Sequence, residues 1–233
     1  MDPLKDRLVT AAVVSRGPLG ADGARGRDVR TWLADPGVEI PEAAAAVHGI
    51  TTERARAEGR PAAQVLEEVA RALAEAMARG TPVVAFNASF DLTLMEAELA
   101  RHGLPGLRER LGRGGAGAGD GIGPILDPLV LDRAVDRYRR GKRRLGDLCA
   151  VYGVRVDESL HTAEVDVAAA LDVLEAMARV HPRLGSMSLE ELQGFQVRAH
   201  REWAESFNAW LARKNPGRAG ADPSWPLAKE LRA

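Results

Sequence analysis

The sequence contains one cysteine, Cys149, which excludes an internal disulfide framework and any zinc site built from several cysteines. It also lacks an excess of one charge, since 32 Lys and Arg residues face 33 Asp and Glu residues. A uniformly basic coat for nucleic acid is therefore excluded, although a local basic patch is not. The longest early apolar run, residues 8–14, is too short to span a membrane and lacks the layout of a signal peptide. We expect a soluble, cytoplasmic protein with no membrane partner.

Aromatic residues are scarce, at 4% of the chain, and half of them lie after residue 185. In this last part, Ser188 and Glu191 form a capping box, which predicts the start of a helix. A single apolar stripe with helical spacing follows, made of Leu192, Phe195, Ala199, Trp203, Phe207 and Trp210. We interpret the stripe as packing against the rest of the domain, and the alternative is a docking face for a partner protein.

Strand and helix patterns alternate along the first 180 residues. Residues 8–14 and 29–33 read as two strands joined by a glycine-rich turn, which suggests an antiparallel hairpin. Helical periodicity covers residues 61–79, and the buried strand predicted at 82–86 runs directly into another helix. A short strand at 125–127 and a long alanine-rich helix at 162–178 complete the pattern, which predicts an α/β or mixed α+β fold.

Three short segments carry possible chemistry. Asp91 follows the buried strand, at the edge of the sheet where α/β proteins commonly bind ligands. His161 and Asp166 flank the start of the long helix, and His48 lies in a turn before a threonine N-cap. Taken singly, each segment has a plainer interpretation: a helix-capping acid for Asp91, solvated side chains for His161 and Asp166, and an ordinary turn for His48.

Together, these segments resemble the DEDDh family of 3′–5′ exonucleases, which includes the proofreading epsilon subunit of bacterial DNA polymerase III. Asn87-x-x-Phe90-Asp91 is similar to the second motif of the family, and His161-x-Ala-x-x-Asp166 to the third. The resemblance covers roughly residues 1–180. It implies a ribonuclease-H-like fold, with a mixed sheet flanked by helices.

The first motif of that family, Asp-x-Glu on a central strand, has no counterpart in this sequence. Its expected place lies just before the stretch that begins at Asp2, and we do not assign its roles to Asp2 or Asp6. We therefore expect an N-terminally truncated domain with a gap between the strands at 8–14 and 82–86. On this interpretation the chain as written is marginally stable and impaired as an enzyme, and the natural product starts upstream.

The resemblance also implies the chemistry of the site. Asp91 and Asp166 would be two of four acids that hold a pair of Mg²⁺ or Mn²⁺ ions, because these hard cations prefer carboxylate oxygens. His161 would be the general base that deprotonates the attacking water. His48, Asn87 and Phe90 would contact the terminal nucleotide, although Asn87 is also suited to ordering its own turn.

A basic run between the second and third motifs is the main candidate for holding the nucleic-acid backbone. Its members are Arg133, Arg137, Arg139, Arg140, Lys142, Arg143 and Arg144. We predict that Arg139, Arg140 and Arg143 contact phosphates, and the alternative is a solvated face. Tyr138 lies inside the run, and we expect it to be partly buried.

The sequence thus predicts residues 1–182 as the exonuclease domain without its first strand, 183–214 as a C-terminal amphipathic helix, and 215–233 as an irregular tail. The expected function is metal-dependent 3′–5′ hydrolysis of DNA in proofreading or repair. The expected partners are single-stranded or 3′-terminal nucleic acid, with DNA favoured over RNA, and a DNA polymerase. The alternatives are a catalytically inactive nucleic-acid-binding or polymerase-associated module and an exonuclease that acts on RNA.

Overall fold

The computed structural model describes residues 2–20, 25–112, 121–155 and 163–231. The chain starts with a long antiparallel hairpin of β1 (Thr10–Leu19) and β2 (Arg25–Asp35), in which Val14 lies opposite Val29. The predicted hairpin is therefore present, with both strands longer than the apolar pattern indicated. Two short helices, α1 (Glu42–His48) and α2 (Thr52–Glu58), lead to β3 (Arg60–Pro61), which pairs in parallel with β2.

The second sheet is small. It contains β4 (Val83–Val84) and β5 (Ile125–Leu126), which pair in parallel. The connection between them carries α4 (Ala88–Arg101) and α5 (Leu107–Leu111), as a crossover between parallel strands requires. In the residues that the structure describes, β1 and β4 belong to separate sheets and are not hydrogen-bonded to each other.

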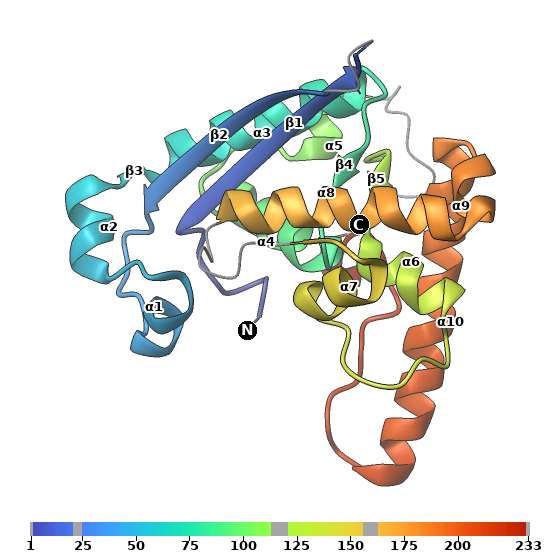
Figure 1. Ribbon diagram of the computed structural model, residues 1–233. Coiled ribbons are helices and arrows are strands. Elements are labelled where there is room, and N and C mark those ends of the chain that lie inside the picture. The colour runs from blue at the N-terminus through green and yellow to red at the C-terminus, as the bar shows by residue number, and fades with distance from the viewer. Residues whose placement is uncertain (1, 21–24, 113–120, 156–162, 232–233) are drawn as a thin grey trace.

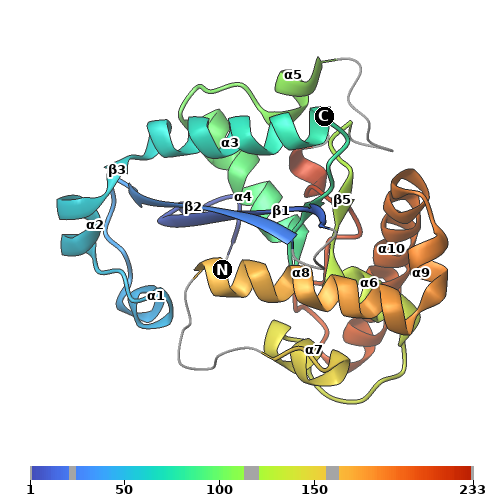
Figure 2. The ribbon, with the colours of Figure 1, turned by 45° about the horizontal axis from the view of Figure 1, so that its top comes forward.

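Helices cover both faces of the hairpin. Figure 2 shows α3 (Ala62–Ala78) and α8 (Ala163–Val180) on opposite sides of β1 and β2. The main core fills the space between the hairpin, α3 and α4, with Leu66, Met77 and Leu99 fully buried. A second cluster, which includes Leu131, Leu148 and Met177, joins α8 to α6 (Pro128–Val135) and α7 (Leu145–Tyr152).

The segment before β1 is fixed to α4 by a buried carboxylate. Glu98 is fully buried, and its Oε2 accepts a hydrogen bond from the Leu8 N–H at 3.1 Å. The other oxygen pairs with Arg101, whose guanidinium also donates to the Leu4 carbonyl. A buried carboxylate is stable only when it is paired and hydrogen-bonded, and here these contacts supply both conditions. The start of β1 is thereby held over the C-terminal half of α4.

The C-terminal part begins with α9 (Pro182–Ser186) and continues as the long helix α10 (Leu189–Lys214), which projects beyond the sheets in Figure 1. The predicted capping box is present, because the Ser188 and Glu191 side chains each accept a backbone N–H from the other. The tail then returns along α10 and ends in a short 3-10 helix, Lys229–Leu231. The division of the chain at residues 182 and 214 stays a prediction. No helix in the described stretches is both long and apolar enough to cross a membrane.

Candidate active site

Asp91 lies in the first turn of α4, immediately after β4. The turn is possible because Asn87 adopts a left-handed backbone conformation, with φ of 64°, which asparagine tolerates better than most residues. The Asn87 side chain is exposed and makes no capping hydrogen bond. Asn87 therefore orders the turn through its backbone rather than through a side-chain cap.

Asp91 is an exposed residue, and yet the pKa of its carboxyl is raised to about 7. The larger cause is loss of hydration among the surrounding protein atoms, and the smaller is repulsion from the Asp127 carboxylate. Both observations hold when water reaches part of the residue while protein atoms surround the carboxyl and remove much of its hydration. The Asp91 carboxyl therefore holds its proton more tightly than an ordinary aspartate does.

Asp127 holds the N-terminal end of α4 in place. It is the N-cap of α6, where its Oδ1 accepts the Leu129 N–H at 2.9 Å. The same carboxylate also accepts the N–H groups of Asn87, at 3.0 Å, and Ala88, at 2.9 Å. These donors belong to the start of α4 and have no partner within the helix. Burial raises the pKa of Asp127, and hydrogen bonds from backbone N–H groups, including these three, oppose that rise.

Asp166 lies in the first turn of α8, with an exposed side chain. Further along the same helix, Asp172 and Glu175 form ion pairs with Arg16 of β1 at 2.8 and 3.3 Å, which fixes α8 against the hairpin. Asp91 therefore follows β4, and Asp166 is carried by a helix attached to β1. His161 lies outside the described residues. Among the residues that are described, no group of three or more His, Cys, Asp or Glu side chains is arranged to hold a metal ion.

The residues predicted to contact the terminal nucleotide do not all lie in one place. Phe90 is half-buried in the first turn of α4, next to Asp91. His48 is the last residue of α1, and its Nδ1 accepts the Ile50 N–H at 3.2 Å. This nitrogen is therefore engaged in a hydrogen bond within the turn that follows α1. We find Asn87, Phe90 and Asp91 together on one turn, while no contact in the described structure joins His48 to them.

The basic run divides into inward-facing and outward-facing side chains. Arg139 and Arg143 point inward, with only 15% and 14% of their side chains exposed. Both pair with Asp132, which is fully buried, and Arg139 does so at 2.6 Å. Tyr152 donates its hydroxyl proton to the other oxygen of Asp132 at 2.9 Å. Arg139 and Arg143 therefore stabilise the connection between α6 and α7, which is a different use from the predicted phosphate contact.

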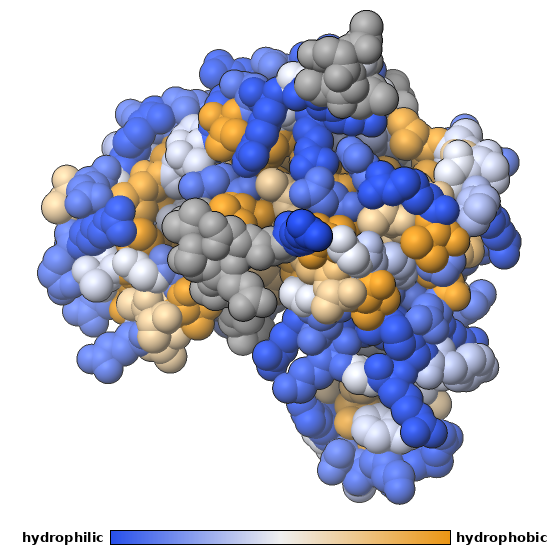
Figure 3. Space-filling view, viewed as in Figure 1, coloured by the Kyte–Doolittle hydropathy of each residue, from blue (hydrophilic) through white to orange (hydrophobic). Residues whose placement is uncertain are grey.

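The remaining members of this connection face solvent. We call the exposed set the basic loop, and its members are Arg137, Tyr138, Arg140, Lys142 and Arg144. The expectation of a partly buried Tyr138 is wrong, because 88% of this residue is exposed and its ring meets only the Arg137 guanidinium, at 5.8 Å. Arg133 is not part of the loop, since it packs over the Trp203 ring at 3.7 Å. The surface over the connection between α6 and α7 is mostly hydrophilic (Figure 3).

Sequence reasoning missed Asp127 and Asp132. The dipeptide Asp127-Pro128 is a recognisable helix start, with an N-cap acid before a proline at the first helical position. That signal predicts the cap of α6, but it does not show that the same carboxylate also holds α4. Asp132 carries no local signal, because its partners lie 7, 11 and 20 residues away.

The exonuclease family model matches residues 22–174, which is more than half of the chain and includes Asp91 and Asp166. The chain belongs to the exonuclease family. The resemblance inferred from the two motifs is thus confirmed at the level of the family. Exonucleases of this kind are hydrolases that cleave phosphodiester bonds.

Relatives and solved structures agree with this assignment. The PolC-type DNA polymerase III of Streptococcus thermophilus is 29% identical over 160 residues, or 68% of this chain, and the chain spans only 9% of that relative. Exonuclease I from Methylocaldum szegediense has a TM-score of 0.58 at 21% identity, over 91% of this chain and 43% of that one. A product-bound exonuclease I has a TM-score of 0.53 at 14% identity, over 85% and 48%. The exonuclease is therefore confirmed as an α/β protein of the ribonuclease-H-like fold.

Proposed function

We propose that the exonuclease degrades DNA from the 3′ end, with divalent cations, in replication proofreading or repair. The observation that carries the proposal is the family match over residues 22–174, within which Asp91 and Asp166 each occupy the first turn of a helix. The relative that is named a DNA polymerase supports DNA as the substrate and a polymerase as a partner. A cytoplasmic location follows from this role.

Asp91 and Asp166 would bind the metal. Carboxylate oxygens are the ligands that Mg²⁺ and Mn²⁺ prefer, so the chemistry of these two side chains fits such ions. When bound, a pair of these cations neutralises charge on the phosphate and makes the attacking water more acidic. Two carboxylates are fewer than a two-metal site requires, which agrees with the finding that no described cluster of three ligands is present.

The remaining roles belong to residues of this chain. His161 would accept the proton of the attacking water, because imidazole changes its protonation near neutral pH. The water oxygen would then form a bond to phosphorus while the bond to the 3′ oxygen of the preceding nucleotide breaks. That oxygen takes up a proton and stays on the shortened strand as a 3′ hydroxyl, and a nucleoside 5′-monophosphate leaves. Phe90 and Asn87, on the same turn as Asp91, would contact the terminal nucleotide, with His48 as a further contact.

Replacing His161 by Asn should slow turnover by roughly 10²–10⁴-fold, which is the usual contribution of a general base. Mn²⁺ affinity should change little, because the variant keeps both acids. Single-turnover rates between pH 6 and 9 measure the effect, and the matched control is His102→Asn, at an exposed histidine that ends α4. An unchanged pH–rate profile in His161→Asn would assign the proton transfer to another group.

The basic loop should bind the phosphate backbone of a single strand. Changing its four cations to Gln should reduce the slope of log affinity against log salt by roughly 0.7 for each phosphate that is no longer neutralised. Tyr138→Ala should weaken binding by roughly tenfold, the scale of one base stacked on an aromatic ring. Fluorescence anisotropy with labelled oligonucleotides in EDTA measures both effects.

The control is an equal loss of charge at exposed cations elsewhere, namely Arg27, Arg56, Arg79 and Arg213. If the loop and control variants have the same salt dependence, the loop is only a solvated face. Neutralising Arg139 or Arg143 instead should affect stability first, because their partner is the buried Asp132.

The direction and substrate are tested with DNA and RNA strands labelled at one end. A 5′ label should yield a ladder of shortened strands with Mn²⁺, and a 3′ label should yield mononucleotide at once. Faster degradation of RNA would favour the alternative substrate. An N-terminally extended chain that binds strands without degrading them would favour the inactive binding module.

A further inference from the structure

Two glutamines of α10 lie against the outer edge of β5. Gln193 and Gln196 are buried, at 1% and 0% exposure. The Gln193 amide accepts the Ile125 N–H at 2.7 Å and donates to the Ile122 carbonyl at 2.8 Å. The Gln196 amide accepts the Asp127 N–H at 2.7 Å and donates to the Ile125 carbonyl at 2.9 Å. The two side chains therefore occupy the position of a neighbouring strand.

The backbone groups of β5 form hydrogen bonds on both sides of the strand. The carbonyls of Pro124 and Leu126 accept N–H groups from Val83 and Ala85 on the β4 side. The groups that point the other way, at Ile125 and Asp127, are the ones bound by the glutamines. A buried strand edge needs such partners, because an unpaired backbone group away from water is costly. Helix α10 thus satisfies the edge of the sheet as well as packing against it.

Gln196 is linked to the first turn of α4, which carries Asp91, through hydrogen bonds of Asp127. Its oxygen fixes the main chain of Asp127, and the Asp127 carboxylate accepts the N–H groups of Asn87 and Ala88. Those two residues form the turn that starts α4 and precede Asp91 by one helical turn. Gln193 makes the same kind of contact to the same strand, but none to Asp127.

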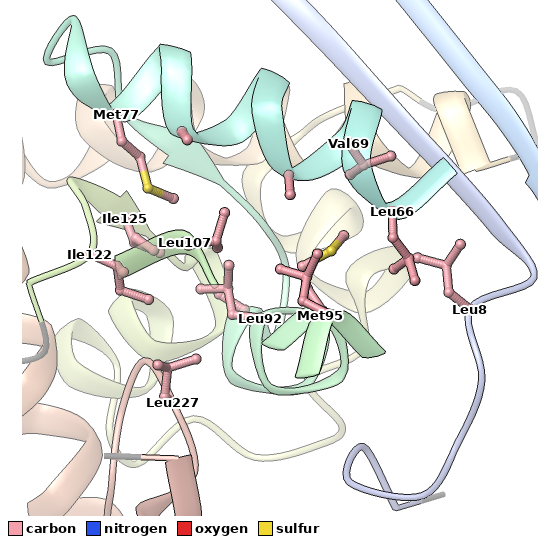
Figure 4. Close-up of a cluster of buried hydrophobic side chains, with 14 of the residues drawn as sticks. Leu8, Leu66, Val69, Met77, Leu92, Met95, Leu107, Ile122, Ile125 and Leu227 are labelled. Atoms are coloured by element: carbon pink, nitrogen blue, oxygen red, sulfur yellow. The ribbon is translucent and has the colours of Figure 1, made fainter. Parts of the chain in front are cut away.

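The tail that follows α10 holds α4 at a second point. Trp225 and Leu227 are almost fully buried in the main core, and Figure 4 shows Leu227 facing Leu92 of α4. The N–H of Ala228 donates to the Thr93 hydroxyl at 3.0 Å, and Thr93 lies two residues after Asp91. The segment from α10 to Leu231 therefore contacts the first half of α4 independently of the glutamines.

We propose that Gln196 is a positioning residue of the exonuclease site, which fixes the first turn of α4 through Asp127 and so places Asp91. The inference rests on the proposed function of Asp91. It also assigns the C-terminal extension to the machinery of the site, since the extension reaches α4 through Gln196 and through the tail.

Hydrogen exchange of the full-length chain tests the proposal, with Gln196→Met compared to Gln193→Met. Each variant replaces one buried amide by an apolar side chain of similar length, and each removes two hydrogen bonds to the same strand. In Gln196→Met, protection of the Asn87 and Ala88 amides should fall by roughly tenfold, the scale of one hydrogen bond. In Gln193→Met, the protection of these two amides should stay as in the parent, once the change in the free energy of global unfolding is subtracted.

The result that overturns the proposal is equal protection of Asn87 and Ala88 in the two variants, after correction for their unfolding free energies. Mn²⁺ titration of the parent chain and of Asp91→Asn, followed by the electron paramagnetic resonance of free Mn²⁺, tests the proposed function separately. If the parent and Asp91→Asn bind Mn²⁺ equally, the assignment of Asp91 fails, while the exchange data still decide the role of Gln196. If Asp91 binds Mn²⁺, weaker binding by Gln196→Met than by Gln193→Met supports the proposal, and equal binding contradicts it.

Discussion

Asp91→Ala and Asp166→Ala should each abolish nuclease turnover. Each variant removes one of the two carboxylates that this chain would offer to divalent cations, and hydrolysis of a phosphodiester depends on those cations to stabilise charge in the transition state. Release of labelled mononucleotide from a single strand with saturating Mn²⁺ measures the loss. The assay applies to whichever form shows turnover, the 233-residue chain or an N-terminally extended one.

The matched control is Asp172→Ala, on the same helix as Asp166 but paired with Arg16 of β1. This variant should keep its turnover, because Arg16 retains its ion pair with Glu175 and Asp172 has no assigned role in the site. Asp91→Asn separates folding from chemistry, since a neutral side chain replaces a carboxyl that its surroundings already favour in the neutral form. It should fold as well as the parent and yet be inactive. Near-normal turnover in any of the Asp91 or Asp166 variants would mean that the site lies elsewhere.

Asp132→Ala should lower the free energy of unfolding by roughly 3–5 kcal/mol, the cost of breaking a buried ion pair by removing one partner. Asp132 is fully buried, and it accepts hydrogen bonds from Arg139, Arg143 and Tyr152. Without it, two guanidinium groups with only 15% and 14% exposure lose their buried carboxylate, and Asp136 remains only as a partly exposed partner of Arg139. A loss of this size is a large part of the roughly 5–15 kcal/mol that stabilises a typical domain.

Urea denaturation followed by circular dichroism measures the change. The neighbouring Arg140→Ala is the control, because Arg140 is exposed and its replacement should change stability by no more than about 0.5 kcal/mol. Asp132→Ala should also weaken binding of single strands, since the exposed cations of the basic loop depend on the inward pair for their positions. A destabilisation below about 1 kcal/mol would show that Asp132 does not hold this connection.

Local patterns predicted the elements of the fold well. The capping box at Ser188, the helical spacing of α3 and the pairing of β1 with β2 each depend on residues close together in the sequence. The same is true of the turn from β4 into α4, where Asn87 and Asp91 form one short motif. Two family motifs, together with the segment around His48 and in the right order, were enough to indicate the exonuclease family, because their chemistry is tied to specific residue types.

The contacts that organise the site were not predictable in this way. Gln196 and Asp127 are 69 residues apart, and nothing in the sequence around either residue indicates the other. The basic run was also predicted incompletely, since a row of arginines in the sequence does not show which side chains point into the protein. Only the position of Asp132 under the run separates Arg139 and Arg143 from the exposed Arg140. Tyr138 was misjudged for the same reason, because exposure of a tyrosine depends on the packing around it.

The central claim is that Asp91 and Asp166 bind the same divalent cations, and paramagnetic broadening by Mn²⁺ in nuclear magnetic resonance spectra tests it most directly. With increasing Mn²⁺, the amide signals of the first turns of α4 and α8 should broaden together, at concentrations that leave the signals of α10 sharp. Asp91→Asn should reduce the broadening in both turns. Broadening at only one of the two turns, or equal broadening in the parent and in Asp91→Asn, would contradict a shared metal site.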